Sequence, residues 1–326
     1  MTKVFIARAI PGEAARRLAE AALDVEIWPG EMPPGRDELG AMLLQCDAVM
    51  TMVTDRIDRD LMRQAPRLRV IANMAVGYDN VSPSEAAEEG VWLTNTPGVL
   101  AETTADLAFA LLMDAARNLT ASDRDTRAGG WKTWSPTAFL GQDIFGSTLG
   151  IVGLGEIGEA MARRAVGFSM RVLYASRTPK PELEATGLQR RTLDELLAES
   201  NFVSLHVPYN DRTRHLMAAR EFALMKPGAI LINTSRGGVV DQDALVEALR
   251  AGRIGGAALD VAEPEPLPPS HPLFSLPNVV ITPHIGSASL ATRSKMADMA
   301  ATNILAVLGG HEPPNAVNRP PNPRSP

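Results

Sequence analysis

The chain has 326 residues, more than one hydrophobic core usually serves, so we expect two domains. Apolar residues make up 45% and charged residues 21%, which is typical of globular proteins, and no apolar run approaches the roughly 18 residues of a membrane span. The net charge is −6 and the basic residues are dispersed. We therefore expect a cytoplasmic protein that binds neither membrane nor nucleic acid.

Short apolar runs alternate with amphipathic stretches from residue 3 to residue 98. Strand and helix periods that take turns predict a parallel sheet with helices on its faces. The expected strands are Val4–Ala7, Ala48–Val53, Arg69–Met74 and Val91–Leu93, and the expected helices lie around Glu13–Ala22 and Asp60–Gln64.

The same alternation restarts after Pro97-Gly98, with a long helix from about Thr104 to Arg117 as the bridge. We expect the helix at about 291–308 to return to the first domain. The tail beyond Gly310 has six prolines among sixteen residues and is expected to be extended on the surface or disordered. The strands expected in the second domain are Leu149–Leu154, Arg171–Ser176, a short one near Arg190, Phe202–Val207, Ala229–Thr234, Gly256–Val261 and Val279–Thr282.

A glycine-rich turn, Gly153-Leu154-Gly155-Glu156-Ile157-Gly158, lies where a predicted strand ends and a helix begins. In this GxGxxG pattern the first glycine permits a tight turn and the second lets the backbone approach a pyrophosphate. The third lets the helix pack close to the strand. Because a helix N-terminus favours anions, the turn predicts a dinucleotide-binding site.

The end of the next strand decides between NAD and NADP. An acidic residue there binds the ribose 2′-hydroxyl and repels a 2′-phosphate. Here the sequence reads Ser176-Arg177-Thr178, with no acid before Glu182, and Arg177 stands 19 residues after Gly158. A cation and two hydroxyls suit a phosphate, although a solvated surface arginine is the alternative interpretation. We expect NADPH as the preferred cofactor and NADH as the alternative.

Three ionisable residues, Arg236, Glu265 and His284, follow the ends of predicted strands. Ligands bind at this edge of a parallel sheet, so we expect the three near the nicotinamide. Reduction of a 2-oxo acid needs a proton donor and a cation for the carboxylate. His284 can be the general acid, Glu265 can hold its ring and favour the charged form, and Arg236 can clamp the carboxylate and polarise the carbonyl. Each also has a purely structural interpretation.

The other reactive side chains carry weaker signals. His206 is expected to line the cofactor cleft, while the remaining histidines are interpreted as surface residues. The single cysteine, Cys46, cannot form an internal disulfide and is interpreted as a core residue. Because no histidines and carboxylates have zinc-ligand spacing, no metal is expected.

The motifs occur in the order of one family. They are the glycine turn, then Asn233-Thr234-Ser235-Arg236-Gly237-Gly238, Ala258-Leu259-Asp260-Val261 with Pro264-Glu265-Pro266, and Pro283-His284-Ile285-Gly286. On these motifs essentially the whole chain resembles the D-isomer-specific 2-hydroxyacid dehydrogenases. Within that family it is most similar to the glyoxylate/hydroxypyruvate reductases, through Ser176-Arg177-Thr178, Gly130-Trp131-Lys132-Thr133-Trp134 and His284-Ile285-Gly286-Ser287-Ala288.

The resemblance implies an α/β fold of two domains. A Rossmann domain with a doubly wound parallel sheet is expected at 99–290, and a smaller flavodoxin-like substrate domain at 1–98 and 291–326. A homodimer through the dinucleotide-binding domain is also implied. In such a dimer Trp134 would close the active site of the other subunit, the alternative being an ordinary core or interface tryptophan.

Further site residues follow from the same resemblance. Val76 and Gly77 are expected to offer backbone N–H groups to the substrate carboxylate, and Ser287 is expected to join Arg236, His284 and Trp134 in substrate binding. The residues expected to contact the cofactor are Thr104, Gly153, Leu154, Gly155, Glu156, Ile157, Gly158, Ser176, Arg177, Thr178, His206, Val207, Pro208, Thr213, Thr234, Ser235, Asp260 and Gly286.

The expected activity is NAD(P)-dependent reduction of small 2-oxo acids, glyoxylate to glycolate and hydroxypyruvate to D-glycerate. D-lactate dehydrogenase, or a dehydrogenase for another D-2-hydroxy acid, is the alternative within the family. A dinucleotide-sensing co-repressor without activity is the alternative from another class, because fold alone does not decide function. The presence of Arg236, Glu265 and His284 together favours catalysis.

Overall fold

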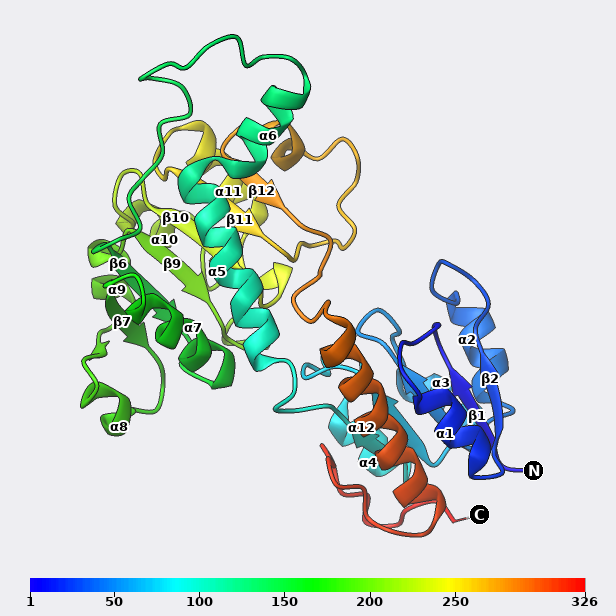
Figure 1. Ribbon diagram of the computed structural model, residues 1–326. Helices are drawn as coiled ribbons and strands as arrows, with labels where there is room; N and C mark the ends of the chain where they lie inside the picture. Colours follow the sequence, from blue (N-terminus) through cyan, green and yellow to red (C-terminus); the bar gives the residue numbers. More distant parts are fainter. Residues whose placement is uncertain (326) are drawn as a thin grey trace. The chain divides into compact units, whose positions relative to one another are not determined.

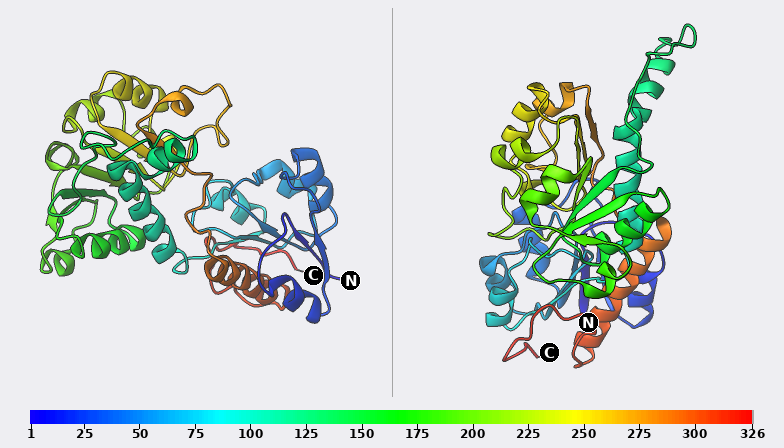
Figure 2. Two further views of the ribbon diagram at one scale, coloured as in Figure 1. Left: turned by 45° about the horizontal axis from the view of Figure 1, so that its top comes forward. Right: turned by 90° about the vertical axis from the view of Figure 1, so that its left-hand side faces the viewer.

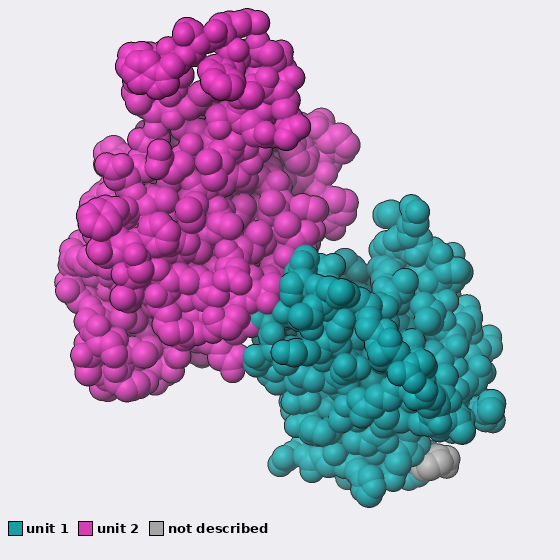
Figure 3. Space-filling model, in the orientation of Figure 1, with its two compact units in different colours: residues 1–100, 287–326 teal, residues 101–286 magenta. Residues whose placement is uncertain are grey.

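The computed structural model describes residues 1–325, and they form two compact units (Figure 3). Unit 1 contains Met1–Leu100 and the C-terminal segment that begins at Ser287, and unit 2 contains Ala101–Gly286. In both units strands alternate with helices along the chain (Figure 1). This confirms the predicted α/β class, which rests on the alternation of apolar runs and amphipathic stretches.

Unit 2 contains, within the described residues, a parallel sheet of seven strands in the order β12-β11-β10-β9-β6-β7-β8. The chain order reverses between β6 and β9, which makes this the switch point of a doubly wound Rossmann sheet. Every strand lies within or overlaps a segment predicted from the sequence. The strands are β6 (Thr148–Val152), β7 (Arg171–Ala175), β8 (Gln189–Arg190), β9 (Phe202–Leu205), β10 (Ile230–Asn233), β11 (Gly256–Leu259) and β12 (Val279–Ile281).

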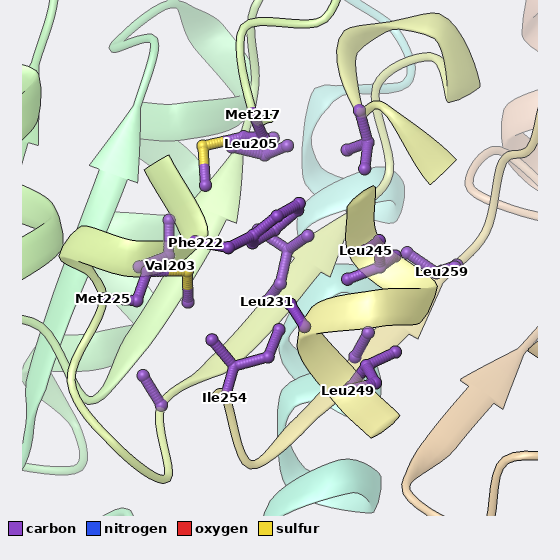
Figure 4. Packing of buried hydrophobic residues seen from close by; sticks show 14 of the residues in the cluster. Val203, Leu205, Met217, Phe222, Met225, Leu231, Leu245, Leu249, Ile254 and Leu259 are labelled. Carbon is purple, nitrogen blue, oxygen red and sulfur yellow. The ribbon is translucent and has the colours of Figure 1, made fainter. Parts of the chain in front are cut away.

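Helices cover both faces of this sheet. On one face lie α5 (Ala101–Arg117) and α7 (Glu156–Val166), and on the other lie α9 (Leu193–Glu199), α10 (Ala219–Leu224) and α11 (Gln242–Arg250). Figure 4 shows the core on the second face, where Phe222 of α10 lies beside Leu231 of β10. Since the central strands β6, β9, β10 and β11 are buried between these helices, a ligand reaches them at the strand ends.

Unit 1 contains, within the same described range, five parallel strands in the flavodoxin-like order β2-β1-β3-β4-β5. Its strands are β1 (Lys3–Ile6), β2 (Asp24–Ile27), β3 (Ala48–Thr51), β4 (Val70–Asn73) and β5 (Trp92–Thr94). Helices α1 (Ala14–Glu20) and α12 (Leu290–Leu308) cover one face, and α2 (Arg36–Leu43), α3 (Arg59–Gln64) and α4 (Pro83–Glu88) cover the other. The apolar runs did not indicate β2, the edge strand.

The C-terminal segment belongs to unit 1, as the expected return of the helix at 291–308 requires. Beyond α12 the tail is bound to β5 rather than loose: Val317 N–H donates to the Leu93 carbonyl at 2.8 Å. The buried Asn318 side chain accepts from Leu93 N–H at 2.8 Å and donates to the Val91 carbonyl at 2.9 Å. The tail therefore satisfies backbone groups that an edge strand otherwise leaves unpaired.

A projecting segment extends from unit 2, and we call residues 118–141 the arm (Figure 2, right-hand view). It begins with α6 (Leu119–Arg127), none of whose residues is buried. The exposed large apolar side chains of the arm are Leu119, Trp131, Trp134, Phe139 and Leu140. Within residues 1–325, no helix combines the length and the apolar character that crossing a membrane requires.

Replacing Asn318 by alanine is expected to destabilise unit 1. The change leaves the backbone N–H of Leu93 and the carbonyl of Val91 without their partner, and each such buried group costs about 1–3 kcal/mol. Urea unfolding should show a lower midpoint, and hydrogen exchange should show faster exchange in the peptide that covers β5. Asn322→Ala, at an exposed position of the same tail, is the control. Equal stability of the two variants would contradict the assigned role.

Candidate active site

The glycine turn after β6 has the geometry that a dinucleotide needs. Gly153 has φ +95°, and a Cβ there would come 2.6 Å from the carbonyl oxygen of His206. A Cβ at Gly158 would come 2.3 Å from the carbonyl oxygen of Gly153, so helix and strand pack too closely for a side chain. A Cβ at Gly155 would meet nothing within 4 Å, so the space before the N-terminus of α7 is open to a pyrophosphate.

A buried hydroxyl at the carboxyl edge of the sheet supports the same fit. Thr234 follows β10 and is 9% exposed, and its Oγ1 has no hydrogen-bond partner within residues 1–325. Buried polar atoms are rarely left unpaired, so an unpaired one indicates a ligand or an ordered water. Thr104, buried in α5, lies beside Gly286: a Cβ on Gly286 would come 3.3 Å from Thr104 Cγ2. These residues fit a dinucleotide bound across the switch point.

The end of β7 carries the residues expected to select the cofactor. Arg177 is exposed, and its guanidinium forms no ion pair within residues 1–325. Lys180 nearby is neutralised, because its Nζ lies 3.0 Å from Glu159 Oε1. Arg190 of β8 donates to the carbonyls of Ser176 and Arg177 at 3.2 and 3.4 Å, a link that the sequence did not indicate. Within residues 1–325, Arg177 and Arg190 are thus both cations without an ion pair at this strand end.

His206 and Thr213 belong to the segment after β9. Desolvation lowers the pKa of His206 to about 4, and its Nε2 lies 2.8 Å from Ser204 Oγ. The ring is therefore neutral at pH 7 and unsuited to donate a catalytic proton. Thr213 Oγ1 donates to the carbonyl of Pro208 at 2.6 Å, which shapes the loop that carries His206, Val207 and Pro208.

Arg236, Glu265 and His284 follow three adjacent strands, β10, β11 and β12. The turn that carries Arg236 packs against the loop that leads to Glu265, because a Cβ on Gly237 would come 2.0 Å from the carbonyl carbon of Ala262. Asn233 fixes this turn: its amide donates to the Arg236 carbonyl at 2.9 Å and accepts from Ser235 N–H at 3.0 Å. The arginine therefore extends from a rigid strand end.

Glu265 and His284 form a short hydrogen bond, 2.5 Å between Oε1 and Nδ1. Their side chains are 35% and 30% exposed, so both are reachable from the sheet edge. With Nδ1 bound to the carboxylate, Nε2 is the ring atom left to exchange a proton with a substrate. This is the arrangement in which a carboxylate orients a histidine for general acid–base chemistry.

Asp260, at the end of β11, fixes the backbone that carries His284. Its carboxylate accepts from Thr282 Oγ1 at 2.6 Å and from the N–H groups of Ile285 and Gly286 at 2.8 Å each. His284 itself has φ +53°, in the left-handed region that costs energy for most residues with a side chain. Burial raises the pKa of Asp260 even though these donors oppose the change. The sequence indicated Asp260 only as a cofactor contact and did not indicate Thr282.

The remaining predicted residues lie elsewhere. Val76 and Gly77 follow β4 in unit 1, and Ser287 is the first residue of the C-terminal segment of that unit. Trp134 stands apart on the arm with a side chain that is 80% exposed. Cys46 is fully buried, and burial raises the pKa of its thiol to about 12. Within residues 1–325, no group of three histidine, cysteine or carboxylate side chains is placed to hold a metal ion.

Comparison with known proteins shows the family to which this chain is related. Residues 109–286 match the model of the D-isomer specific 2-hydroxyacid dehydrogenase, NAD binding domain. The chain is 49% identical over 319 residues to a glyoxylate reductase of Korarchaeum cryptofilum, covering 97% of this chain and 96% of that protein.

Two solved structures are similar over almost the whole chain. One is an NADPH-dependent glyoxylate/hydroxypyruvate reductase of Sinorhizobium meliloti in complex with NADP and malonate, with a TM-score of 0.88, 32% identity, and coverage of 100% of this chain and 99% of that one. The other is a D-lactate dehydrogenase of Aquifex aeolicus complexed with NAD and lactic acid, with a TM-score of 0.85, 28% identity, and coverage of 98% and 100%.

The family match covers the nucleotide-binding unit, and the similarity to a curated relative covers nearly the whole chain. The chain therefore belongs to the D-isomer specific 2-hydroxyacid dehydrogenase family and is an oxidoreductase that uses a nicotinamide dinucleotide.

Proposed function

We propose that this enzyme uses NADPH to reduce small 2-oxo acids, glyoxylate to glycolate and hydroxypyruvate to D-glycerate. The observation that carries the proposal is the 2.5 Å hydrogen bond between Glu265 and His284, on the sheet edge that also carries Arg236. These groups supply a proton donor and a cation, which the reduction of a charged carbonyl compound requires. Similarity to glyoxylate reductases supports the substrate class.

In the proposed reaction, three side chains of this chain have distinct roles. When bound, the reduced nicotinamide supplies a hydride to the carbonyl carbon. His284 donates the proton on Nε2 to the carbonyl oxygen, while Glu265 holds the Nδ1–H and keeps the ring oriented. Arg236 polarises the carbonyl and binds the substrate carboxylate. The carboxylate also accepts hydrogen bonds from the backbone N–H groups of Val76 and Gly77. Solvent then returns a proton to His284.

A panel of substrates and cofactors tests this function directly. We expect glyoxylate and hydroxypyruvate to give the highest kcat/KM with NADPH, and pyruvate and phenylpyruvate to give lower values. Oxidation of NADPH and NADH at 340 nm against each acid would provide the ranking. A preference for pyruvate would instead favour the D-lactate alternative, and no turnover with any 2-oxo acid would refute the proposal.

Substituting His284 by alanine is expected to lower kcat about 10²- to 10⁴-fold, the usual effect of removing a general acid. Cofactor affinity should remain unchanged, because the ring acts on the substrate. Steady-state kinetics and NADPH fluorescence titration would measure both. His311→Ala removes an exposed histidine of the tail and serves as the control. Wild-type turnover in His284→Ala would exclude His284 as the proton donor.

The NADPH preference rests on Arg177. The residue is exposed just beyond the end of β7, and no acidic residue lies between the end of β7 and Glu182, so a 2′-phosphate meets a cation and two hydroxyls. An exposed carboxylate at this position would instead repel the phosphate.

Arg177→Ala is expected to raise the dissociation constant of NADPH about 10- to 100-fold, the value of one charge-assisted hydrogen bond. The dissociation constant of NADH should hardly change, because NADH lacks the 2′-phosphate. Fluorescence titration with both cofactors gives the two values. Arg250→Ala, at the end of α11, makes the same change in charge elsewhere. Equal effects on NADPH and NADH would contradict a phosphate contact.

A homodimer through unit 2 is also proposed, with the arm as the contact. The apolar side chains Trp131, Trp134 and Leu140 are 72%, 80% and 72% exposed, and such a cluster on a projecting segment favours a protein partner. A second copy of this chain is the partner that the family resemblance favours. In that dimer Trp134 closes the active site of the other subunit.

Light scattering should give twice the mass of one chain for the wild type. Leu140→Asp should shift the mass toward the monomer, because it places a charge in an apolar contact. Trp134→Ala should alter kcat/KM and substrate preference while leaving the fold intact. A monomeric wild type would refute the dimer, and unchanged kinetics of Trp134→Ala would remove its proposed role in the active site.

A further inference from the structure

The turn after β4 in unit 1 presents three consecutive backbone N–H groups, those of Val76, Gly77 and Tyr78. Within residues 1–325 the structure gives no hydrogen-bond acceptor for any of them. Val76 and Gly77 are partly exposed and Tyr78 is exposed. Successive unpaired N–H groups form a concave site that favours anions.

Each of these three N–H groups belongs to a peptide group whose carbonyl accepts a hydrogen bond. The carbonyl of Ala75 accepts from Thr96 N–H at 2.8 Å. The carbonyl of Val76 accepts from Asn95 Nδ2 at 2.9 Å, and that of Gly77 accepts from Asn73 Nδ2 at 2.8 Å. In a trans peptide the N–H points opposite to the C=O. The three bonds therefore direct the N–H groups of Val76, Gly77 and Tyr78 away from the interior of unit 1.

The two asparagines are themselves fixed. Asn73 is fully buried, and its Oδ1 lies 3.2 Å from Thr51 Oγ1. The backbone of Asn95 is bound on both sides: its carbonyl accepts from Asn303 of α12 at 3.4 Å, and its N–H donates to the carbonyl of Asn315 in the tail at 3.3 Å. The C-terminal segment thus supports the turn through Asn95.

We infer that Asn73 and Asn95 are positioning residues of the substrate-carboxylate site, and that Tyr78 N–H is a third donor in it. The inference rests on the proposed function, which assigns the carboxylate to Val76 and Gly77. Without the amide of Asn95 the Val76–Gly77 peptide is free to rotate, and the N–H of Gly77 loses its fixed direction. A preorganised donor costs no ordering when the ligand binds.

Asn95→Asp provides the sharpest variant, because it keeps the shape of the side chain and replaces the N–H donor by a carboxylate oxygen facing the Val76 carbonyl. We expect KM for glyoxylate to rise about 10- to 100-fold, as for the loss of a charge-assisted hydrogen bond, and kcat to change much less. The dissociation constant of NADPH should be unaffected. Asn95→Gln, which retains the amide, should recover part of the KM.

A second readout does not depend on turnover. Oxamate, an unreactive carboxylate, is titrated into the full-length NADPH-bound enzyme labelled with ¹⁵N. In the wild type the amide signals of Val76, Gly77 and Tyr78 should shift, and in Asn95→Asp the oxamate dissociation constant should rise with the KM. Asn318→Ala controls for lost stability of unit 1, because Asn318 contacts β5 but not this turn.

Three outcomes would overturn the inference: no shift of these amides in the wild type, equal oxamate affinity in wild type and Asn95→Asp, or equal effects of Asn95→Asp and Asn318→Ala on KM. If the wild type reduces no 2-oxo acid but these amides still bind oxamate, the proposed reaction fails and the carboxylate site stands.

Discussion

The hydrogen bond between Glu265 and His284 is the interaction on which the proposed chemistry depends. It leaves Nε2 as the only ring atom that can deliver a proton, and it fixes the plane of the imidazole. Asp260 supports this geometry, because it holds the backbone around His284 through Thr282, Ile285 and Gly286, with His284 in a left-handed conformation. The parallel sheet supplies the last condition, since β11 and β12 are neighbours whose carboxyl ends share one edge.

A similar set of side-chain to backbone hydrogen bonds occurs at the strand ends of both units. A buried amide or carboxylate at the end of a strand, or just beyond it, binds backbone groups of an adjacent turn and so fixes the direction of its functional groups. Asn233 does this for the turn of Arg236, Asp260 for that of His284, and Asn73 for that of Gly77. Because these side chains are buried, their bonds are shielded from competing water and hold the turns rigidly. Preorganisation of this kind lowers the cost of binding a charged ligand.

Much of the fold is predictable from the sequence because the signals are local. Phe202–Leu205 is fully buried and apolar apart from Ser204, and the glycine turn spans only six residues. β2 was not predicted, because an edge strand such as Asp24-Val25-Glu26-Ile27 is half exposed and has no apolar run. The tail was expected to lie extended on the surface or to be disordered, because it is rich in proline. Its attachment depends on Asn318 meeting a strand more than 200 residues away in sequence.

In the candidate site, too, some residues could be predicted from the sequence and others could not. The strand ends indicated Arg236, Glu265 and His284, because a parallel sheet brings its carboxyl ends to one edge. The supporting contacts were not indicated, since Thr282 and Asn95 act through partners that only the folded chain brings near. Arg190 is another such case, because β8 must pair with β7 before its side chain reaches the loop after β7.

A double-mutant cycle tests the central claim, that Glu265 acts through His284. The kcat for glyoxylate is measured in the wild type, Glu265→Gln, His284→Gln and the double variant. If the pair works as one unit, Glu265→Gln lowers kcat in the wild type but has almost no further effect once His284 is replaced. Additive losses, with Glu265→Gln equally harmful in both backgrounds, would contradict the account.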